Sequence, residues 1–203
     1  MKIICIGRNY AEHAKEMNSA IPTEPVFFLK PDTALIKDNQ PFYYPDFSKE
    51  IHHEVELVLK ISKPGKNIDS KYAHKYYDEI GIGIDFTARD IQSKCKEKGL
   101  PWEKAKAFDG SAPIGQFIDK KKLIDLDNIN FHLTINGIVI QKGNTKDLLF
   151  TFDAVIAYVS KFITLKTGDL IFTGTPEGVG PVRIGDKLEA FIENEKLLNF
   201  EIK

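Results

Sequence analysis

The spacing of apolar and polar residues divides the first half of the chain mainly into short strands. Apolar residues dominate residues 2–6 and 26–30, which is typical of buried strands. Residues 54–61 (EVELVLKI) alternate polar and apolar side chains at their start and are rich in branched residues, so they also predict a strand. In residues 79–85 (EIGIGID), glycine occupies alternate positions of a further predicted strand, where another backbone or a ligand can approach closely.

Strand patterns also dominate the second half of the chain. Residues 131–135 and 138–142 flank Asn136-Gly137, a dipeptide that strongly predicts a two-residue hairpin turn. Three more strands are expected at residues 170–173, 187–192 and 197–202.

Helical patterns are fewer. Four segments are expected to be helical: residues 9–18, 71–77, 87–98 and 151–165. Asn9 is the candidate N-cap of the first, and Thr87 and Asp90 have the spacing of a capping box at the start of the third. Strands and helices do not alternate regularly, which excludes a Rossmann fold or a TIM barrel. The predicted fold class is therefore α+β, mostly β, and without a linker or a repeat the chain is expected to form a single domain, residues 1–203.

Composition and charge narrow the classes of function. Of the 203 residues, 42% are hydrophobic and 28% are charged, as in ordinary globular proteins, which excludes a disordered chain. The net charge of −1 lacks the basic excess of proteins that bind nucleic acid or membrane surfaces, so neither partner is expected. The two cysteines cannot form a disulfide framework, and the apolar run at the N-terminus is too short for a signal peptide. We therefore expect a cytoplasmic protein.

Three acidic residues are the strongest candidates for a metal site. Glu54 and Glu56 lie two apart on a predicted strand, so their side chains point to one face, where a divalent cation would offset their repulsion. Asp85 ends the next predicted strand, where it could reach the same point. Three carboxylates favour Mg²⁺ or Mn²⁺, whereas a nitrogen ligand from His52, which shares the parity of the glutamates, would favour Zn²⁺ or Fe²⁺. The same spacing is also compatible with glutamates on the solvated face of an edge strand.

A histidine and a glutamate form a second candidate pair. His13 and Glu16 are three apart and so share one face of the first predicted helix. A carboxylate beside an imidazole holds its tautomer, which is how a general base is built. On an exposed helix, however, such a pair is usually ordinary surface electrostatics.

Residues 173–181 (TGTPEGVGP) form a glycine-rich loop after a predicted strand. The loop lacks the Gly-Lys-Ser/Thr ending of a phosphate loop, so nucleotide binding is excluded. Its backbone N–H groups and Thr175 could hold a small carboxylate, or the segment could be a plain tight turn.

Six stretches spread over nearly the whole chain are distinctive in combination: IGRNYAEHAKEM (6–17), PVFFLKP (25–31), HHEVEL (52–57), DFTARDIQ (85–92), KGLPWEKAKAFD (98–109) and TGTPEGVGP (173–181). In this order they resemble the fumarylacetoacetate hydrolase family, and within it the short single-domain branch that contains acylpyruvate hydrolases and oxaloacetate decarboxylases. The resemblance implies a mixed β-roll with short peripheral helices, which is expected to form a homodimer.

The resemblance also implies roles for nine side chains. Those expected to hold Mg²⁺ or Mn²⁺ are Glu54, Glu56 and Asp85, which leaves His52 outside the ligand set. Those expected to be catalytic are His13, Glu16 and Lys106, the first two on a lid helix spanning residues 9–18. Those expected to line the substrate pocket are Arg89, Gln92 and Thr175.

We expect from this resemblance an enzyme that acts on a small 2-oxo acid, foremost a hydrolase that breaks the C3–C4 bond of acylpyruvates through an enolate. In that reaction His13, oriented by Glu16, would activate water. Alternatives of the same type are oxaloacetate decarboxylase, keto–enol tautomerase, and an isomerase or hydrolase of aromatic ring-cleavage products. A metal-stabilised ligand-binding module without catalysis is the alternative from another class.

Overall fold

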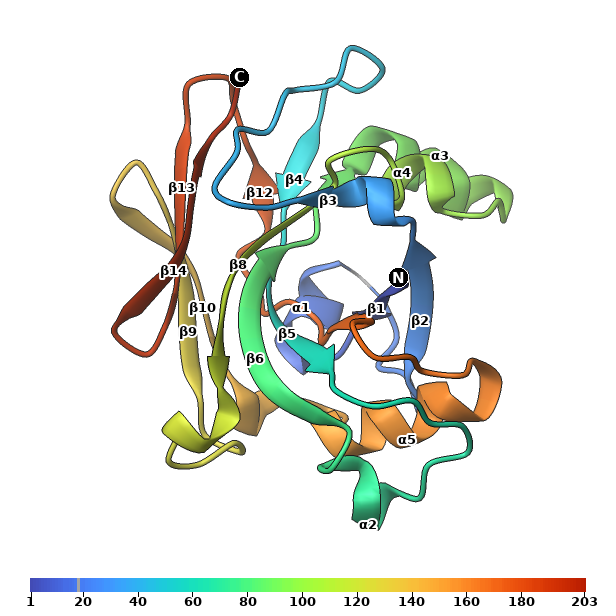
Figure 1. Cartoon of the computed structure of the whole chain (residues 1–203). Coiled ribbons are helices and arrows are strands. Elements are labelled where there is room, and N and C mark those ends of the chain that lie inside the picture. The colour runs from blue at the N-terminus through green and yellow to red at the C-terminus, as the bar shows by residue number, and fades with distance from the viewer. Residues whose placement is uncertain (18) are drawn as a thin grey trace.

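The computed structural model describes residues 1–17 and 19–203, and these residues form a mostly-strand α+β fold around a curved sheet (Figure 1). The large sheet has the order β2 (Val26–Lys30), β1 (Ile3–Gly7), β11 (Leu170–Phe172), β5 (Val55–Ile61), β6 (Tyr77–Ile84), β8 (Ala112–Asp119) and β3 (Leu35–Ile36). Strands β1 and β11 are parallel, as are β3 and β8, and the other neighbours are antiparallel.

Two smaller sheets complete the strand structure. The four-stranded sheet has the order β10 (Ile138–Asn144), β9 (Asn130–Ile135), β13 (Lys187–Ile192) and β14 (Glu195–Glu201). The three-stranded sheet has the order β12 (Gly180–Pro181), β4 (Ile51–His53) and β7 (Thr87–Ala88). Figure 1 shows the four-stranded sheet standing to one side of the large sheet.

The helices are few and short, as the family resemblance implies. They are α1 (Ala11–Glu16), α2 (Ser70–Ala73), α3 (Arg89–Lys98), α4 (Glu103–Lys106) and α5 (Phe152–Phe162). In Figure 1, α3 and α4 lie at one end of the large sheet, and α5 and α2 lie at the other. No helix among the described residues is long and apolar enough to cross a membrane.

Strand β5 lies in the middle of the large sheet and is buried on both faces. Leu57 and Leu59 point into the main core, whereas Val58 packs in a second apolar cluster on the opposite face. Glu56 shares the parity of Val58, and it is 1% exposed. The alternative in which the glutamates occupy the solvated face of an edge strand is therefore wrong.

The glycines of β6 make room for neighbouring groups, as the alternating pattern predicts. A Cβ at Gly83 would lie 2.8 Å from the Phe172 ring and 2.9 Å from the Pro113 carbonyl oxygen. A Cβ at Gly81 would lie 2.9 Å from the Phe117 ring. Close packing therefore requires glycine at both positions.

The hairpin prediction is confirmed. Strands β9 and β10 are joined at Asn136 and Gly137, whose φ values of 53° and 80° are both positive. Positive φ at both central residues is what a type I′ turn requires, and asparagine followed by glycine adopts it at low cost.

Three local predictions are wrong. The first helix begins at Ala11 rather than Asn9, because the Asn9 side chain instead donates to the Phe150 and Thr173 carbonyls at 3.0 and 2.8 Å. The predicted end of this helix, Asn18, lies outside the described residues. The capping box fails, since Thr87 belongs to β7 and the helix begins at Arg89 without a side-chain cap. The segment 71–77 is helical only to Ala73, because Tyr77 already begins β6.

Candidate active site

The three predicted metal ligands come together where two neighbouring strands end. Glu54 occupies the one-residue interruption between β4 and β5, and Asp85 follows directly after β6. The Asp85 amide donates to the Glu54 carbonyl at 2.8 Å, which continues the β5–β6 ladder past its last strand pair. With Glu56 from β5, each residue offers a carboxylate oxygen within 4.8 Å of the other two, and all three residues are buried.

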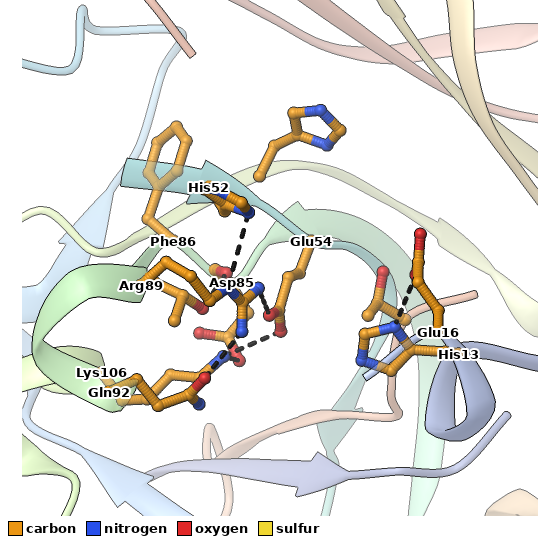
Figure 2. A network of polar contacts seen from close by, with 12 residues as sticks. His13, Glu16, His52, Glu54, Asp85, Phe86, Arg89, Gln92 and Lys106 are labelled. Carbon is orange, nitrogen blue, oxygen red and sulfur yellow. Dashed lines mark hydrogen bonds and ion pairs between the residues drawn. The ribbon is translucent and has the colours of Figure 1, made fainter. Parts of the chain in front are cut away.

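Three buried cationic side chains contact this carboxylate trio, and Figure 2 labels Lys106 and Arg89 among them. Lys106 Nζ donates to Glu54 Oε2 at 2.8 Å and to Asp85 Oδ2 at 2.7 Å. Arg89 donates to Glu54 Oε1 at 2.6 Å, and Lys30 Nζ lies 2.7 Å from Asp85 Oδ1. Burial alone would raise the pKa of Glu54, but Lys106 and Arg89 hold it well below its usual range. Burial opposes the charge on Lys106, yet Asp85 and Glu54 raise its pKa.

Lys30 was not among the predicted site residues. It is 2% exposed, and its Nζ also donates to the Ser111 carbonyl at 2.7 Å and the Phe86 carbonyl at 3.3 Å. The only sequence signal is a lysine that closes an apolar run before a proline (PVFFLKP), which is also common at the end of an ordinary strand.

Glu56 differs from the other two acids because it has no cationic partner among the described residues. Its Oε2 accepts from the Gly174 amide at 2.7 Å. Burial and the carboxylates of Asp85 and Glu54 raise the pKa of Glu56 well above its usual range. In addition, Asp85 Oδ1, although close to Lys30, accepts no hydrogen bond of good geometry from the described residues. A buried trio of oxygen donors with one uncompensated carboxyl and one unsatisfied oxygen fits a hard divalent cation.

The histidine–glutamate pair lies across the cavity from Lys106. His13 is 7% exposed on α1, and its Nδ1 lies 3.2 Å from Glu16 Oε2 (Figure 2). With a carboxylate acceptor at Nδ1, the neutral imidazole keeps its proton there and leaves Nε2 free to accept one. The Gly178 amide donates to Glu16 Oε1 at 3.1 Å, so the glycine-rich loop fixes the glutamate from its other side.

The loop 173–181 thus uses backbone N–H groups to hold carboxylates of the protein itself. Gly174 binds Glu56 and Gly178 binds Glu16, while Thr175 lines the cavity that the carboxylate trio faces. The interpretation of the loop as a plain tight turn is therefore wrong.

The remaining predicted residues also reach this cavity. Gln92 accepts from Arg89 Nη1 at 2.7 Å, and both side chains line the cavity. His52, in contrast, lies outside the carboxylate trio, where its Nε2 contacts Glu50 at 3.0 Å and its Nδ1 accepts from Arg89 Nε at 3.4 Å. The structure therefore places His52 beside Arg89 rather than among the acids.

Comparison with known proteins identifies the family. The family model described as fumarylacetoacetate (FAA) hydrolase C-terminal matches residues 2–202. The chain belongs to the fumarylacetoacetate hydrolase family. Among curated members of this family, the mitochondrial oxaloacetate tautomerase of Mus musculus is 44% identical over 201 residues, 99% of this chain and 91% of the relative. The mitochondrial oxaloacetate decarboxylase of Dictyostelium discoideum is 46% identical over 192 residues, 94% of this chain and 88% of the relative.

A solved structure of the same family shows the same fold. The crystal structure of fumarylpyruvate hydrolase from Pseudomonas aeruginosa, in complex with Mn²⁺ and pyruvate, superposes with a TM-score of 0.94. It is 35% identical to this chain, and the match covers 100% of this chain and 89% of that one. The family and the fold class predicted from the six motifs are therefore confirmed.

Proposed function

We propose that this chain is a divalent-cation-dependent enzyme acting on small 2-oxo acids, with oxaloacetate as its substrate and keto–enol tautomerisation as its main reaction. The observation that carries the proposal is the buried trio of Glu54, Glu56 and Asp85 facing the same cavity as the His13 base. The curated relatives named above favour oxaloacetate over the acylpyruvates that the resemblance placed first. The site residues supply the same chemistry in either case, because each reaction passes through negative charge at C3 of a 2-oxo acid.

The carboxylate trio would hold Mg²⁺ or Mn²⁺. When bound, such an ion polarises a carbonyl oxygen and offsets negative charge that develops on it. The fit of the residues supports this assignment, since Glu56 forms no ion pair with the described residues and the donors are all oxygen.

His13 would move the proton in this reaction. Its Nε2 accepts a proton from C3 of the keto acid, and the Glu16 carboxylate stabilises the imidazolium that forms. In the reverse direction the imidazolium returns the proton to C3. If C4 is lost as CO₂ instead, the electrons of the C3–C4 bond form the enolate of pyruvate, and C3 then takes a proton that comes from solvent, so this reaction needs no base to remove a C3 proton. A positioned general base of this kind typically contributes about 10²–10⁴-fold in rate.

The cations around the trio would hold the substrate and its charge. Arg89 and Gln92 form one wall of the cavity and present N–H donors suited to a carboxylate. Lys106 keeps a positive charge next to Glu54 and Asp85, close to where negative charge would develop on the substrate. Thr175 offers a hydroxyl from the opposite loop.

Hydrolysis of acylpyruvates is the second candidate. It is favoured by the buried His13, whose partner Glu16 also accepts from the Gly178 amide, since this pair could activate water as well as a C–H bond. It is also favoured by the named activity of the Pseudomonas hydrolase. Water would add to C4, the C3–C4 bond would break, and pyruvate and a carboxylic acid would leave. A protein without decarboxylase activity could still be this hydrolase, because decarboxylation releases C4 as CO₂ whereas hydrolysis adds water to a C4 carbonyl.

The deciding experiment compares three activities of one preparation. The protein is stripped with a chelator and assayed with and without added Mg²⁺ or Mn²⁺ for ketonisation of enol-oxaloacetate, for decarboxylation of oxaloacetate and for hydrolysis of acetylpyruvate. We expect cation-dependent ketonisation to have the highest kcat/KM, and Glu56→Gln to abolish it. Glu79→Gln is the matched control, because Glu79 is a half-exposed glutamate on the adjacent strand β6. Activity that survives chelation would contradict the proposed role of the cation. The absence of all three activities would favour a binding module without catalysis.

The expected homodimer and the absence of nucleic-acid and membrane partners remain predictions. Cytoplasmic location also remains a prediction, and the curated relatives from mouse and Dictyostelium are named as mitochondrial. Sedimentation of the purified protein would test the homodimer, and fractionation of its source cells would test the location.

A further inference from the structure

Gln141 is a buried polar residue that the sheet brings inward by a local irregularity. It lies on β10, the edge strand of the four-stranded sheet, and it is 1% exposed. The β9–β10 register shifts between Val139 and Gln141, so that Gln141 rather than Ile140 pairs with the buried Leu133. Residues paired across a ladder share a face, so this bulge turns a glutamine inward and leaves Ile140 40% exposed. Exchanging an apolar residue for a polar one in this way is costly unless the polar group has partners.

The Gln141 amide group does have partners for its full hydrogen-bonding capacity. Oε1 accepts from the Val55 amide at 3.1 Å and lies 2.8 Å from His53 Nδ1. Nε2 donates to Thr175 Oγ1 and to the Pro176 carbonyl, both at 3.0 Å. A backbone amide can only donate and a carbonyl can only accept, so these partners fix which way the Gln141 amide points.

On its acceptor side, Gln141 binds a backbone N–H of β5 that no neighbouring strand among the described residues reaches. Strand β11 ends at Phe172, and the Thr173 amide makes the next contact with β5, at the Leu57 carbonyl. The Val55 N–H points to the same edge of β5 as that carbonyl, but β11 does not extend that far. Gln141 Oε1 accepts the hydrogen bond from this N–H instead. Its two partners, His53 and Val55, are the residues immediately before and after Glu54.

On its donor side, Gln141 holds the glycine-rich loop. Thr175 and Pro176 lie between Gly174, which binds Glu56, and Gly178, which binds Glu16. One side chain therefore joins the backbone around Glu54 to the loop that contacts Glu56, Glu16 and the cavity.

We propose that Gln141 is a positioning residue for the active site: it fixes Glu54 for cation binding and Thr175 for substrate binding. The inference rests on the proposed function, since it assigns to Glu54 and Thr175 the roles given there. Groups that orient the ligands of a metal typically change metal affinity when they are lost, without touching the ion themselves.

Two substitutions separate the two sides of the amide. Gln141→Leu removes all four contacts, and we expect Mn²⁺ affinity to fall about 10- to 100-fold. Gln141→Glu retains an acceptor for Val55 and His53 but loses the donors to the loop. We therefore expect Gln141→Glu to bind Mn²⁺ at least as tightly as the unmodified protein, while KM for oxaloacetate rises about tenfold and kcat changes less. Gln40→Leu, at an exposed turn, is the control for the change of residue type.

Mn²⁺ binding is measured directly, by the electron paramagnetic resonance signal of the free ion, in protein whose cooperative melting has been verified. A folded Gln141→Leu variant with Mn²⁺ affinity within twofold of the unmodified protein would overturn the inference. If Gln141→Leu does not fold, Gln141→Glu decides: an unchanged KM, or equal losses in affinity, KM and kcat, would also overturn it. Failure of the unmodified protein to bind Mn²⁺ would instead contradict the proposed function, so the two failures are distinguishable.

Discussion

Replacing Lys30 with methionine tests the charge balance of the candidate site. The Lys30 side chain is fully buried, and its partner Asp85 is 2% exposed. At 2.7 Å and an effective dielectric constant of about 20, two unit charges attract each other by roughly 6 kcal/mol, and removing one partner of a buried pair typically costs about 3–5 kcal/mol. Asp85 retains Lys106 at 2.7 Å, so we expect a loss at the lower end, about 3 kcal/mol in the free energy of unfolding.

The measurement is urea denaturation of the chelator-treated protein. Lys60→Met is the matched control: its ion pair with Glu79 has the similar length of 2.6 Å, but the side chains are 42% and 41% exposed, so we expect a loss below about 1 kcal/mol. A double variant, Lys30→Met with Asp85→Asn, should be more stable than Lys30→Met alone, because it removes a buried carboxylate that has lost one of its two cationic partners. A Lys30→Met variant no less stable than Lys60→Met would refute the reasoning.

Three further predictions concern single side chains. In the cation-free protein, Glu56→Gln should be at least as stable as the original at neutral pH. Folding raises the pKa of the Glu56 carboxyl, so its ionisation destabilises the folded state as the pH rises above 4.5. The variant should also lose any rise in melting temperature that Mn²⁺ causes, and persistence of that rise would count against Glu56 as a ligand. His13→Ala should reduce acetylpyruvate hydrolysis at least 100-fold and oxaloacetate decarboxylation much less, because only hydrolysis needs an activated water; equal losses would reject this division. Partial burial works against the Asp90 carboxylate, but hydrogen bonds from Ser48 and the Lys49 and Ile91 amides lower its pKa. Asp90→Asn should therefore lower the free energy of unfolding by about 1 kcal/mol at pH 7, after discounting for solvent screening. In thermal melts at acid pH, this difference in stability should vanish as the pH falls below 3.8 and through the lowered pKa of Asp90. A difference that is independent of pH would contradict the prediction.

Local patterns predict much of the fold because they act over a few residues. Alternation and branching locate β5, β6 and the Asn136-Gly137 hairpin, since these signals depend on the face to which successive side chains point. Caps were predicted less well. The Asn9 side chain is drawn to carbonyls at Phe150 and Thr173, more than 140 residues away along the chain, and no local pattern records those partners.

The candidate site divides in the same way. Glu54 and Glu56 are two residues apart, and Asp85 ends a strand, so the sequence alone indicates that their carboxylates could converge. The resemblance to a known family then adds His13 and Lys106, which spacing leaves ambiguous. Neither source indicates Lys30, because its charge is paired through a contact 55 positions along the chain.

By itself, then, the sequence determined the fold class, the family and which acids could meet, because strand periodicity and motif order are properties of the chain. Only the tertiary structure decided which groups compensate the charges of these acids and which group bonds the backbone beside Glu54. Lys30 arrives from β2, Lys106 from α4 and the Gln141 amide from a bulge at the edge of another sheet. Such partners are selected by the cost of burying an unpaired charge or an unbonded amide, and that cost arises only when distant segments have folded together around it.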